Sequence, residues 1–246
     1  MRLRYPIYFY LVYLLTNSAT AQSGTTGVAM GQEFAELAAH RGLSGKGFAA
    51  FQSYSSTDTR GSQFFFPDWT SGELVTNRKE VFNTGLQFLY DKVRQQLFAR
   101  QKDSSLVLLT NRDEVQSFSL MDENNHQFNF VNSALFSDER PEVFYQVLVY
   151  DSAKLTLLKY IKTTFEKADH TDLMKQNAGD IYDAFVDKNL YYLVWKNGLL
   201  NPVQLKTKSV KKVFADLHMN ADAYLKEHYQ PVDENFLIEM TKQFNH

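Results

Sequence analysis

Hydrophobic and polar residues alternate with a period of two through most of residues 72–131. Such alternation is typical of strands that bury one face. Clusters of Asn, Asp, Gly and Ser interrupt the pattern about every ten residues, which is the spacing of short strands joined by turns. The alternating or apolar runs cover residues 86–90, 106–109, 117–120 and 127–130. We therefore expect an antiparallel meander in this part of the chain.

Residues 90–100 (YDKVRQQLFAR) fit two different structures. Their intrinsic propensity favours a helix, and Val93 and Leu97 would share one face of it. The runs on either side have the strand pattern, and so we predict two strands around a turn near Asp91 and Lys92.

Stronger strand signals follow in the second half of the chain. Residues 143–150 (VFYQVLVY) are apolar on both faces, as expected of a central strand, and residues 154–162 would form its hairpin partner. Residues 190–196 have the composition of another strand, and an Asn-Gly turn comes directly after it. Residues 199–205, which include Pro202, would then form an edge strand.

After Lys208 the apolar period changes to 3.6, which predicts helices. Ser209 and Asp233 can cap the first and the last of them. The stripes with this spacing are Val210, Val213, Phe214 and Leu217; then Ala221, Tyr224, Leu225 and His228; then Phe236, Leu237, Met240 and Phe244. Strands first and helices last predict an α+β fold, in which C-terminal helices pack on an antiparallel meander of about 8–10 short strands.

The first 21 residues have the features of a secretory signal peptide. Arg2 and Arg4 precede an apolar run at residues 7–15, and an A-x-A site ends at Ala21, so cleavage would leave Gln22 first. A membrane anchor is the alternative, but the run is well short of the roughly 20 residues that span a bilayer. We expect an exported protein, periplasmic or extracellular, with no transmembrane segment after the signal is removed.

The remaining chain divides by composition. Residues 22–60 contain two linker-like stretches and are expected to be flexible, with a short helix at residues 32–40. Residues 61–246 are expected to form a single α+β domain.

Composition removes several classes of function. The chain has no Cys, which excludes disulfides, thiol nucleophiles, iron–sulfur clusters and an acylated-cysteine anchor. Its formal net charge is −2, and this argues against a protein that coats nucleic acid. Aromatic residues make up 15% of the chain, which is a high share.

An aromatic cluster precedes the strand region. Phe64, Phe65, Phe66 and Trp69 lie in the segment GSQFFFPDW. One interpretation is an apolar plug that closes the core. The other is an exposed lip that binds an apolar ligand or a glycan.

Four lysines lie close together where the helices begin: Lys206, Lys208, Lys211 and Lys212. They can form a solvated helix start or a contact for a polyanion. Positive charge at a helix N-terminus opposes the helix dipole, and this mild conflict favours a binding role.

Catalytic motifs are missing from the sequence. It contains no G-x-S-x-G, no Walker P-loop and no G-x-G-x-x-G, and its histidines have no metal-binding spacing, so we expect no metal and no cofactor. Ser209 and Lys212 match S-x-x-K without its companion motifs, which we interpret as chance. An enzyme would need at least two members of one set to converge: Asp169, His170, Asp172, Asp180, Asp183 and His228.

Several packing motifs resemble those of a set of uncharacterised secreted proteins common in Bacteroidota-type bacteria. The motifs are G-S-x-F-x-x-x-x-W at residues 61–69, D-E-V-x-x-F at 113–118, and F-Y-x-V-L with L-T-L-L-K-Y within 144–160. The resemblance covers residues 61–245 and implies a bacterial envelope location. It implies no catalytic residues.

These observations favour a non-enzymatic binding or interaction domain whose partner is a protein, an apolar ligand or a glycan. A hydrolase-type enzyme with a carboxylate/His site assembled by the fold is one alternative. A structural accessory of an outer-membrane complex is another.

Overall fold

The computed structural model describes residue 37 and residues 59–104, 107–136, 143–168, 182–195 and 198–246. The expected signal peptide, with its cleavage site between Ala21 and Gln22, lies outside the described residues. So does most of residues 22–60. No helix in the described ranges is long and apolar enough to cross a membrane.

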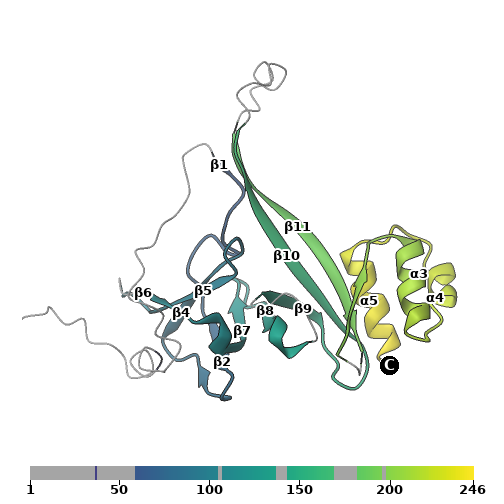
Figure 1. Ribbon diagram of the computed structural model, residues 1–246, viewed down its shortest axis with the longest axis horizontal. Coiled ribbons are helices and arrows are strands. Elements are labelled where there is room, and N and C mark those ends of the chain that lie inside the picture. Colours follow the sequence, from purple (N-terminus) through teal and green to yellow (C-terminus); the bar gives the residue numbers. More distant parts are fainter. Residues whose placement is uncertain (1–36, 38–58, 105–106, 137–142, 169–181, 196–197) are drawn as a thin grey trace, which may run out of the picture.

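Strands come first and helices last, which confirms an α+β fold (Figure 1). The described ranges hold twelve strands, more than the 8–10 expected. The strands are β1 (Thr59–Arg60), β2 (Gly72–Thr76), β3 (Val81–Phe82), β4 (Leu86–Asp91), β5 (Gln96–Gln101), β6 (Val107–Leu109), β7 (Val115–Met121), β8 (Gln127–Asn132), β9 (Phe144–Val149), β10 (Thr156–Glu166), β11 (Asp183–Val194) and β12 (Leu200–Val203). The helices are α3 (Thr207–Asp216), α4 (Asp222–Glu227) and α5 (Glu234–Phe244), with 3-10 turns at η1 (Arg112–Glu114) and η2 (Ser133–Leu135).

The predicted meander is correct only in part. Strands β7 to β11 do follow one another as antiparallel neighbours in the large sheet, whose order is β1-β11-β10-β9-β8-β7-β2-β3, with β12 also paired to β11. However, β1 runs parallel to β11, so this sheet is mixed. Strands β4, β5 and β6 form a separate three-stranded sheet. Pairing between segments distant in sequence, which a local pattern does not reveal, causes both departures.

The prediction for residues 90–100 is confirmed: they form the hairpin of β4 and β5, not a helix. The carboxylate of Asp91 accepts hydrogen bonds from the backbone N–H groups of Val93 and Arg94, both at 2.9 Å, which closes the turn. Tyr90 and Leu97 lie opposite each other and are almost fully buried. Burial of this hairpin therefore outweighs the helix propensity of its residues.

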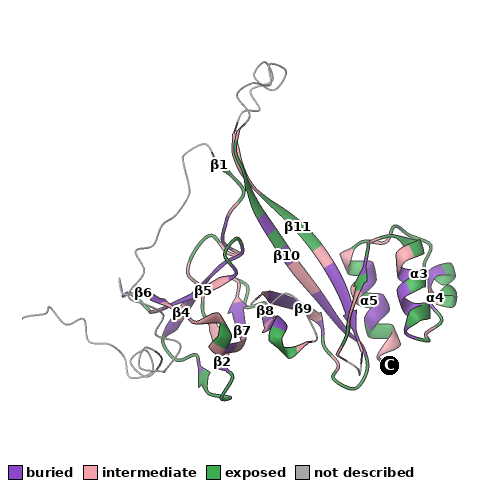
Figure 2. Cartoon of the chain, in the orientation of Figure 1, coloured by how far each residue is buried: buried purple, intermediate pink, exposed green. Residues whose placement is uncertain are grey.

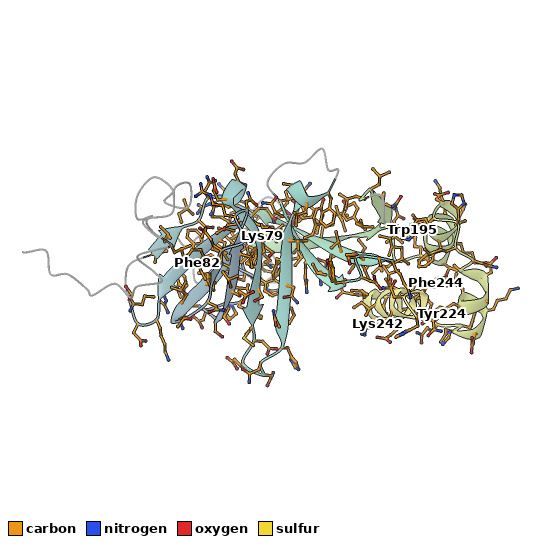
Figure 3. The ribbon with its side chains drawn as sticks, turned by 90° about the horizontal axis from the view of Figure 1, so that it is seen from below. Lys79, Phe82, Trp195, Tyr224, Lys242 and Phe244 are labelled. Carbon is orange, nitrogen blue, oxygen red and sulfur yellow. The ribbon has the colours of Figure 1, made fainter. Side chains whose placement is uncertain are left out.

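Two hydrophobic cores lie on one face of the large sheet. The first joins the small sheet to β2, β7 and β8, and the second joins α3, α4 and α5 to β9–β12. A row of directly opposite residues runs across the sheet from Phe130 in the first core to Tyr191 in the second. Opposite residues point to the same face, so the small sheet and the helices cover neighbouring parts of it. Figure 3 shows Phe82 of the first core and Tyr224 of the helical unit towards opposite ends of the molecule.

Much of the aromatic content lies in the first core. The rings of Phe118 and Phe130 stack at 4.7 Å between centroids, and Tyr90 packs 5.1 Å from each of them. Leu37 is helical and fully buried in the same core, so a residue of the predicted helix at 32–40 contributes to the packing.

Strands β10 and β11 form a long hairpin that extends beyond both cores (Figures 1 and 2). Its register is continuous from Thr156↔Val194 to Glu166↔Ala184. The end near the helices is buried, and the distal end is exposed. The hairpin therefore carries β11 from the helical unit outwards into solvent.

The helices match the predicted stripes, with one correction. Val210, Val213 and Phe214 are buried, and Asp233 caps α5 by accepting from the N–H of Phe236 at 2.7 Å. Ser209 is not the N-cap of α3, because the helix begins two residues earlier at Thr207. The hydroxyl of Ser209 instead accepts a hydrogen bond from the N–H of Gln204, which fixes the turn between β12 and α3.

Candidate functional site

The aromatic cluster of residues 64–69 divides between the core and the surface. Phe64 is buried, whereas Phe65, Phe66 and Trp69 are partly buried. Phe65 packs edge-on against Phe130 of the first core, with ring centroids 5.0 Å apart. Phe64 and Phe65 thus pack against the core, as the interpretation of the segment as an apolar plug requires.

Trp69 and Phe66 also line a pocket of about 400 Å³, which we call the Trp69 pocket. Its walls are residues 66–71 and 121–124. The guanidinium of Arg100 lies 4.5 Å from the centre of the Trp69 ring and holds the indole in place. A second pocket of about 360 Å³ shares Trp69 and includes Phe64. The cluster therefore adjoins concave surface, as a binding role requires.

The four lysines near α3 have different surroundings. Lys211 forms an ion pair of 2.7 Å with Asp222. Lys208 is exposed and is not among the residues that line the pocket beside α3. Lys206 and Lys212 line a pocket of about 800 Å³, twice the volume of the Trp69 pocket. The structure thus separates a cluster that is continuous in sequence.

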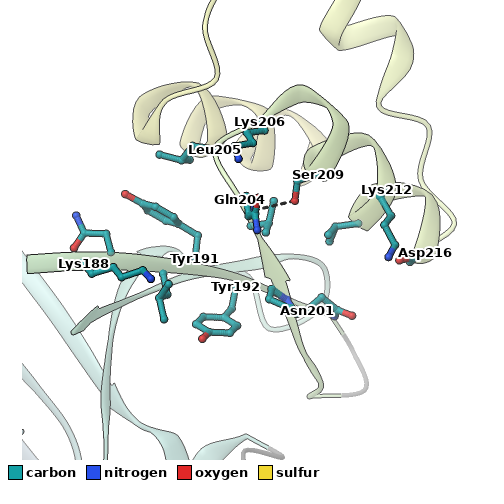
Figure 4. Close-up of a pocket in the computed structure, with 15 residues that line it drawn as sticks. Lys188, Tyr191, Tyr192, Asn201, Gln204, Leu205, Lys206, Ser209, Lys212 and Asp216 are labelled. Carbon is teal, nitrogen blue, oxygen red and sulfur yellow. Dashed lines mark hydrogen bonds between the residues drawn. The ribbon is translucent and has the colours of Figure 1, made fainter.

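We call the larger cavity the β11–α3 pocket. It is formed by residues 188–192 of β11, residues 201–206 of β12 and the following turn, and four residues of α3 (Figure 4). The turn at Gln204 places α3 beside β11, because Ser209 holds the Gln204 N–H at 2.9 Å. One wall of the pocket therefore comes from β11 of the long hairpin. The other walls come from β12, the turn and α3, which follow one another in the sequence.

The charge in the β11–α3 pocket is mainly positive. Lys188, Lys206 and Lys212 line it, against a single acid, Asp216. Lys212 and Asp216 are one helical turn apart on α3 and offset each other in part. Within the described ranges none of the three lysines has a carboxylate within 4.0 Å, so their charge is available to a ligand.

A partly buried polar cluster lies behind Tyr191, one of the residues that line the pocket. The hydroxyl of Tyr191 donates to the carboxylate of Glu234 at 2.7 Å, and the ammonium of Lys159 lies 3.0 Å from the same carboxylate. Burial, together with Glu234, raises the pKa of the Tyr191 phenol well above its ordinary value of 10.0. Tyr191 therefore remains protonated at neutral pH, and its hydroxyl donates to Glu234.

Two members of the set required by the enzyme hypothesis, Asp183 and His228, are among the described residues, and they lie in different parts of the fold. Asp183 begins β11, near the distal end of the long hairpin, and accepts a hydrogen bond from the N–H of Ala168 at 2.8 Å. His228 ends α4, where its ring stacks on Tyr224 at 4.1 Å. Asp183 pairs with β1 at one end of β11, whereas the helices lie near the opposite end of that strand (Figure 1). Asp169, His170, Asp172 and Asp180 lie outside the described residues.

Candidate metal sites were also sought among the side chains that commonly bind metal ions. The described ranges contain no group of three or more His, Asp or Glu side chains placed to hold a metal ion.

Sequence reasoning missed part of the β11–α3 pocket. It did not select Lys188, Asn189 or Asn201, and it assigned Ser209 to a helix cap. Lys188 lies in a run of exposed polar residues, Asp187 to Asn189, that interrupts an otherwise apolar strand. That interruption is the one local signal that could have indicated it.

No family model, no curated protein and no solved structure matches this chain. The functional argument therefore rests on the geometry of the two pockets.

Proposed function

We propose that this protein is an exported, non-enzymatic binding protein that captures an anionic ligand in the β11–α3 pocket. The observation that carries the proposal is the convergence of Lys188, Lys206 and Lys212 from three different elements on one concave surface. A volume of about 800 Å³ is within the range of small-molecule and cofactor sites.

Phosphate, sulfate and carboxylate groups fit these walls. Lysine ammonium groups supply point charges for such anions without requiring one fixed geometry. Asn201 forms part of the wall and is held there by hydrogen bonds from its amide nitrogen to the backbone carbonyls of Leu193 and Leu199, at 3.0 and 3.1 Å. The ring of Tyr192 adds apolar area for the body of a ligand.

The test uses inorganic tripolyphosphate as a defined polyanion. Isothermal titration of the purified protein should show saturable binding to one site. Changing Lys188, Lys206 and Lys212 together to Ala should weaken it at least tenfold, since each lysine contributes to the local field. The affinity should also fall as salt is raised.

Three exposed lysines outside the pocket provide the matched control. Lys208, Lys226 and Lys242 changed together to Ala remove the same net charge. If both triple variants lose affinity equally, binding reflects overall charge and the pocket proposal is wrong.

Export and an envelope location belong to the same proposal. They are supported by the signal-like order of residues 1–21, by the absence of Cys and by the resemblance to secreted bacterial proteins. The mass of the protein recovered from a bacterial host's periplasm should be that of a chain beginning at Gln22, either as the free residue or as its cyclised pyroglutamate form. An uncleaved Met1 on a cytoplasmic product would contradict it.

A second candidate function is glycan or apolar-ligand binding at the Trp69 pocket. It is favoured by one observation: Trp69 and Phe66 line the same cavity as the polar residues Asp122 and Asn124. Aromatic faces beside polar side chains suit ligands with both apolar and hydroxylated surfaces.

Intrinsic fluorescence tests this second site directly. The chain has two Trp, so a Trp195→Phe variant leaves Trp69 as the only reporter. Titration with a panel of soluble oligosaccharides should shift its emission, and a Phe66→Ala change should weaken the response. No spectral change across the panel would remove the glycan version.

A further inference from the structure

We infer that the anionic ligand of the β11–α3 pocket is an extended acidic peptide segment of a partner protein, which binds by adding a strand to the open edge of β11. The inference rests on the proposed function, because it uses the same lysines. It adds a binding mode and a ligand class.

The open edge is a gap between two short strands. Strand β10 pairs with one edge of β11 from Ala184 to Val194. On the other edge, β1 covers Asp183 and Ala184, and β12 covers Tyr191 to Val194. Among the described residues, no strand therefore lies beside residues 185–190 on that edge. Six residues span roughly 20 Å at about 3.4 Å per residue.

Pro202 shows which backbone groups point into the gap. It lies opposite Tyr192 and has no N–H, so this pair is not hydrogen-bonded. The hydrogen-bonded pairs with β12 must then involve Tyr191 and Leu193. Because the pattern alternates along a strand, Asp187 and Asn189 direct their N–H and C=O groups to the same open edge.

The contact between Gly61 and Phe185, at the other end of the gap, indicates the same alternation of backbone groups along β11. A Cβ built on Gly61, next to β1, would lie 2.5 Å from the carbonyl oxygen of Phe185. The Phe185 carbonyl thus points to this edge, two residues before Asp187. Asp187 and Asn189 together offer two N–H and two C=O groups to an incoming strand, which is the requirement for β-strand addition.

Charge selects the partner. Lys188 lies between Asp187 and Asn189 at the centre of the open edge, and Lys206 and Lys212 lie across the pocket. The carboxylate of Asp187 is already engaged by Lys92 and by the hydroxyl of Thr163, each at 2.6 Å, and does not cancel this charge. An incoming strand with Glu or Asp opposite Lys188 would form a favourable cross-strand pair.

The same lysine disfavours a second copy of the chain as the occupant. Antiparallel self-pairing through Asp187 and Asn189 places Lys188 directly opposite the Lys188 of the other copy. Like charges in that position destabilise the pairing, and lysine on an edge strand is a common protection against self-association.

Fluorescence anisotropy provides the test. The probe is a labelled eight-residue peptide of alternating Glu and Thr, compared with its Lys-for-Glu counterpart and with a version N-methylated on alternate residues. The acidic peptide should bind the purified protein. The lysine peptide should not, and N-methylation should weaken binding at least tenfold because it removes backbone donors and leaves the charge unchanged.

A matched pair of variants locates the binding to the edge. Asn189→Pro removes one outward N–H and leaves the ladder to β10 intact, since that N–H points away from β10. Asn189→Ala removes the same side chain and keeps the N–H. We expect Asn189→Pro to bind the acidic peptide at least tenfold more weakly than Asn189→Ala does, because only the proline variant lacks the N–H, and the two variants to bind tripolyphosphate with equal affinity.

Each outcome decides between the two proposals. Equal peptide affinity in the two Asn189 variants, or no effect of N-methylation, overturns strand addition. Tripolyphosphate binding without peptide binding leaves the pocket proposal standing and removes this one. If the protein binds neither tripolyphosphate nor the acidic peptide, both the pocket proposal and the strand-addition inference are wrong. A concentration-dependent dimer that Asn189→Pro disrupts would identify a second copy as the occupant and would also overturn the inference. If Asn189→Pro fails to fold, the comparison of the acidic peptide with its N-methylated version on the unmodified protein still tests strand addition.

Discussion

Lys92 and Asp187 are 95 positions apart in the chain, and their side chains form an ion pair of 2.6 Å. Lys92 belongs to the turn between β4 and β5, and Asp187 lies midway along β11. The pair therefore fastens the small sheet to the long hairpin. The Lys92 side chain is only 8% exposed, whereas that of Asp187 is 40% exposed.

This asymmetry gives the first prediction. Asp187→Ala leaves a buried ammonium without its partner and should lower the free energy of unfolding by about 2 kcal/mol. Lys92→Met keeps most of the buried stem and should cost less. Urea denaturation of the two single variants and the double variant measures the coupling.

The exposed pair of Lys242 and Glu239, 2.8 Å apart, is a suitable control. Glu239→Ala should cost less than about 0.5 kcal/mol, because solvent screens an exposed pair. Equal losses for Asp187→Ala and Glu239→Ala would mean that the Lys92 contact does not fasten the two parts.

The second prediction concerns two glycines with similar backbone angles. Gly61 has φ +75° and Gly198 has φ +69°, so alanine strains both positions by about 1 kcal/mol. A Cβ at Gly198 meets nothing within 4 Å, whereas one at Gly61 meets the Phe185 carbonyl at 2.5 Å. Gly61→Ala should therefore be clearly more destabilising than Gly198→Ala in urea denaturation. Equal losses would contradict the close approach of β1 and β11.

The third prediction concerns Gln95, a buried residue that joins three segments. Its side-chain oxygen accepts from the Tyr90 hydroxyl at 2.8 Å and from the Phe144 N–H at 2.9 Å, and its amide donates to the Lys92 carbonyl at 2.8 Å. Gln95→Met leaves these buried groups unpaired and should cost about 3 kcal/mol. Tyr90→Phe removes a single hydrogen bond and should cost about 1 kcal/mol. Thermal unfolding that ranks the two variants in the opposite order would contradict this arrangement.

The fourth prediction is a pH dependence at Asp91. Burial raises the pKa of its carboxyl above the ordinary value of 3.8, although hydrogen bonds from the Arg94 and Val93 N–H groups act in the opposite direction. The folded state then binds a proton more tightly than the unfolded state. The contribution of Asp91 to stability is present below 3.8 and is lost as the pH rises through the folded-state pKa.

Asp91→Asn removes this titration and keeps an oxygen for the two N–H groups. The stability of the variant relative to the original chain should increase as the pH rises from about 4 to about 8. Chemical denaturation at several pH values measures it. A difference that stays constant, or that decreases with rising pH, would show that burial does not control this carboxyl.

Local patterns were sufficient for most of the secondary structure. The β4–β5 hairpin, the central strand β9, the β10–β11–β12 succession and the three helices all follow from periodicity and turn residues. The Ser209 cap was wrong because Thr207 and Lys208 extend the helix by two residues, and the Ser209 hydroxyl has another partner in Gln204.

The sequence predicted the composition of the candidate sites but not how their residues are arranged. The lysine cluster was visible as charge density, but Lys211 is paired with Asp222 and Lys188 comes from a strand 18 residues before Lys206. The aromatic segment was visible as composition. Its division into buried Phe64 and pocket-lining Trp69 depends on contacts with β4, β5 and β8.

The sequence by itself determined the order of strands and helices, the missing cysteine chemistry and the positions that face a core, because these depend on residue type and short-range spacing. Only the tertiary structure decided that the large sheet is mixed and that the small sheet and the helices share one face. It also decided that, within the described part of the chain, residues 185–190 of β11 have no strand on the edge beside the three lysines. The physical reason is that an edge is defined by which distant strands do not pair with it. The local sequence around residues 185–190 therefore does not predict where the pairing of β11 with β1 ends or where its pairing with β12 begins.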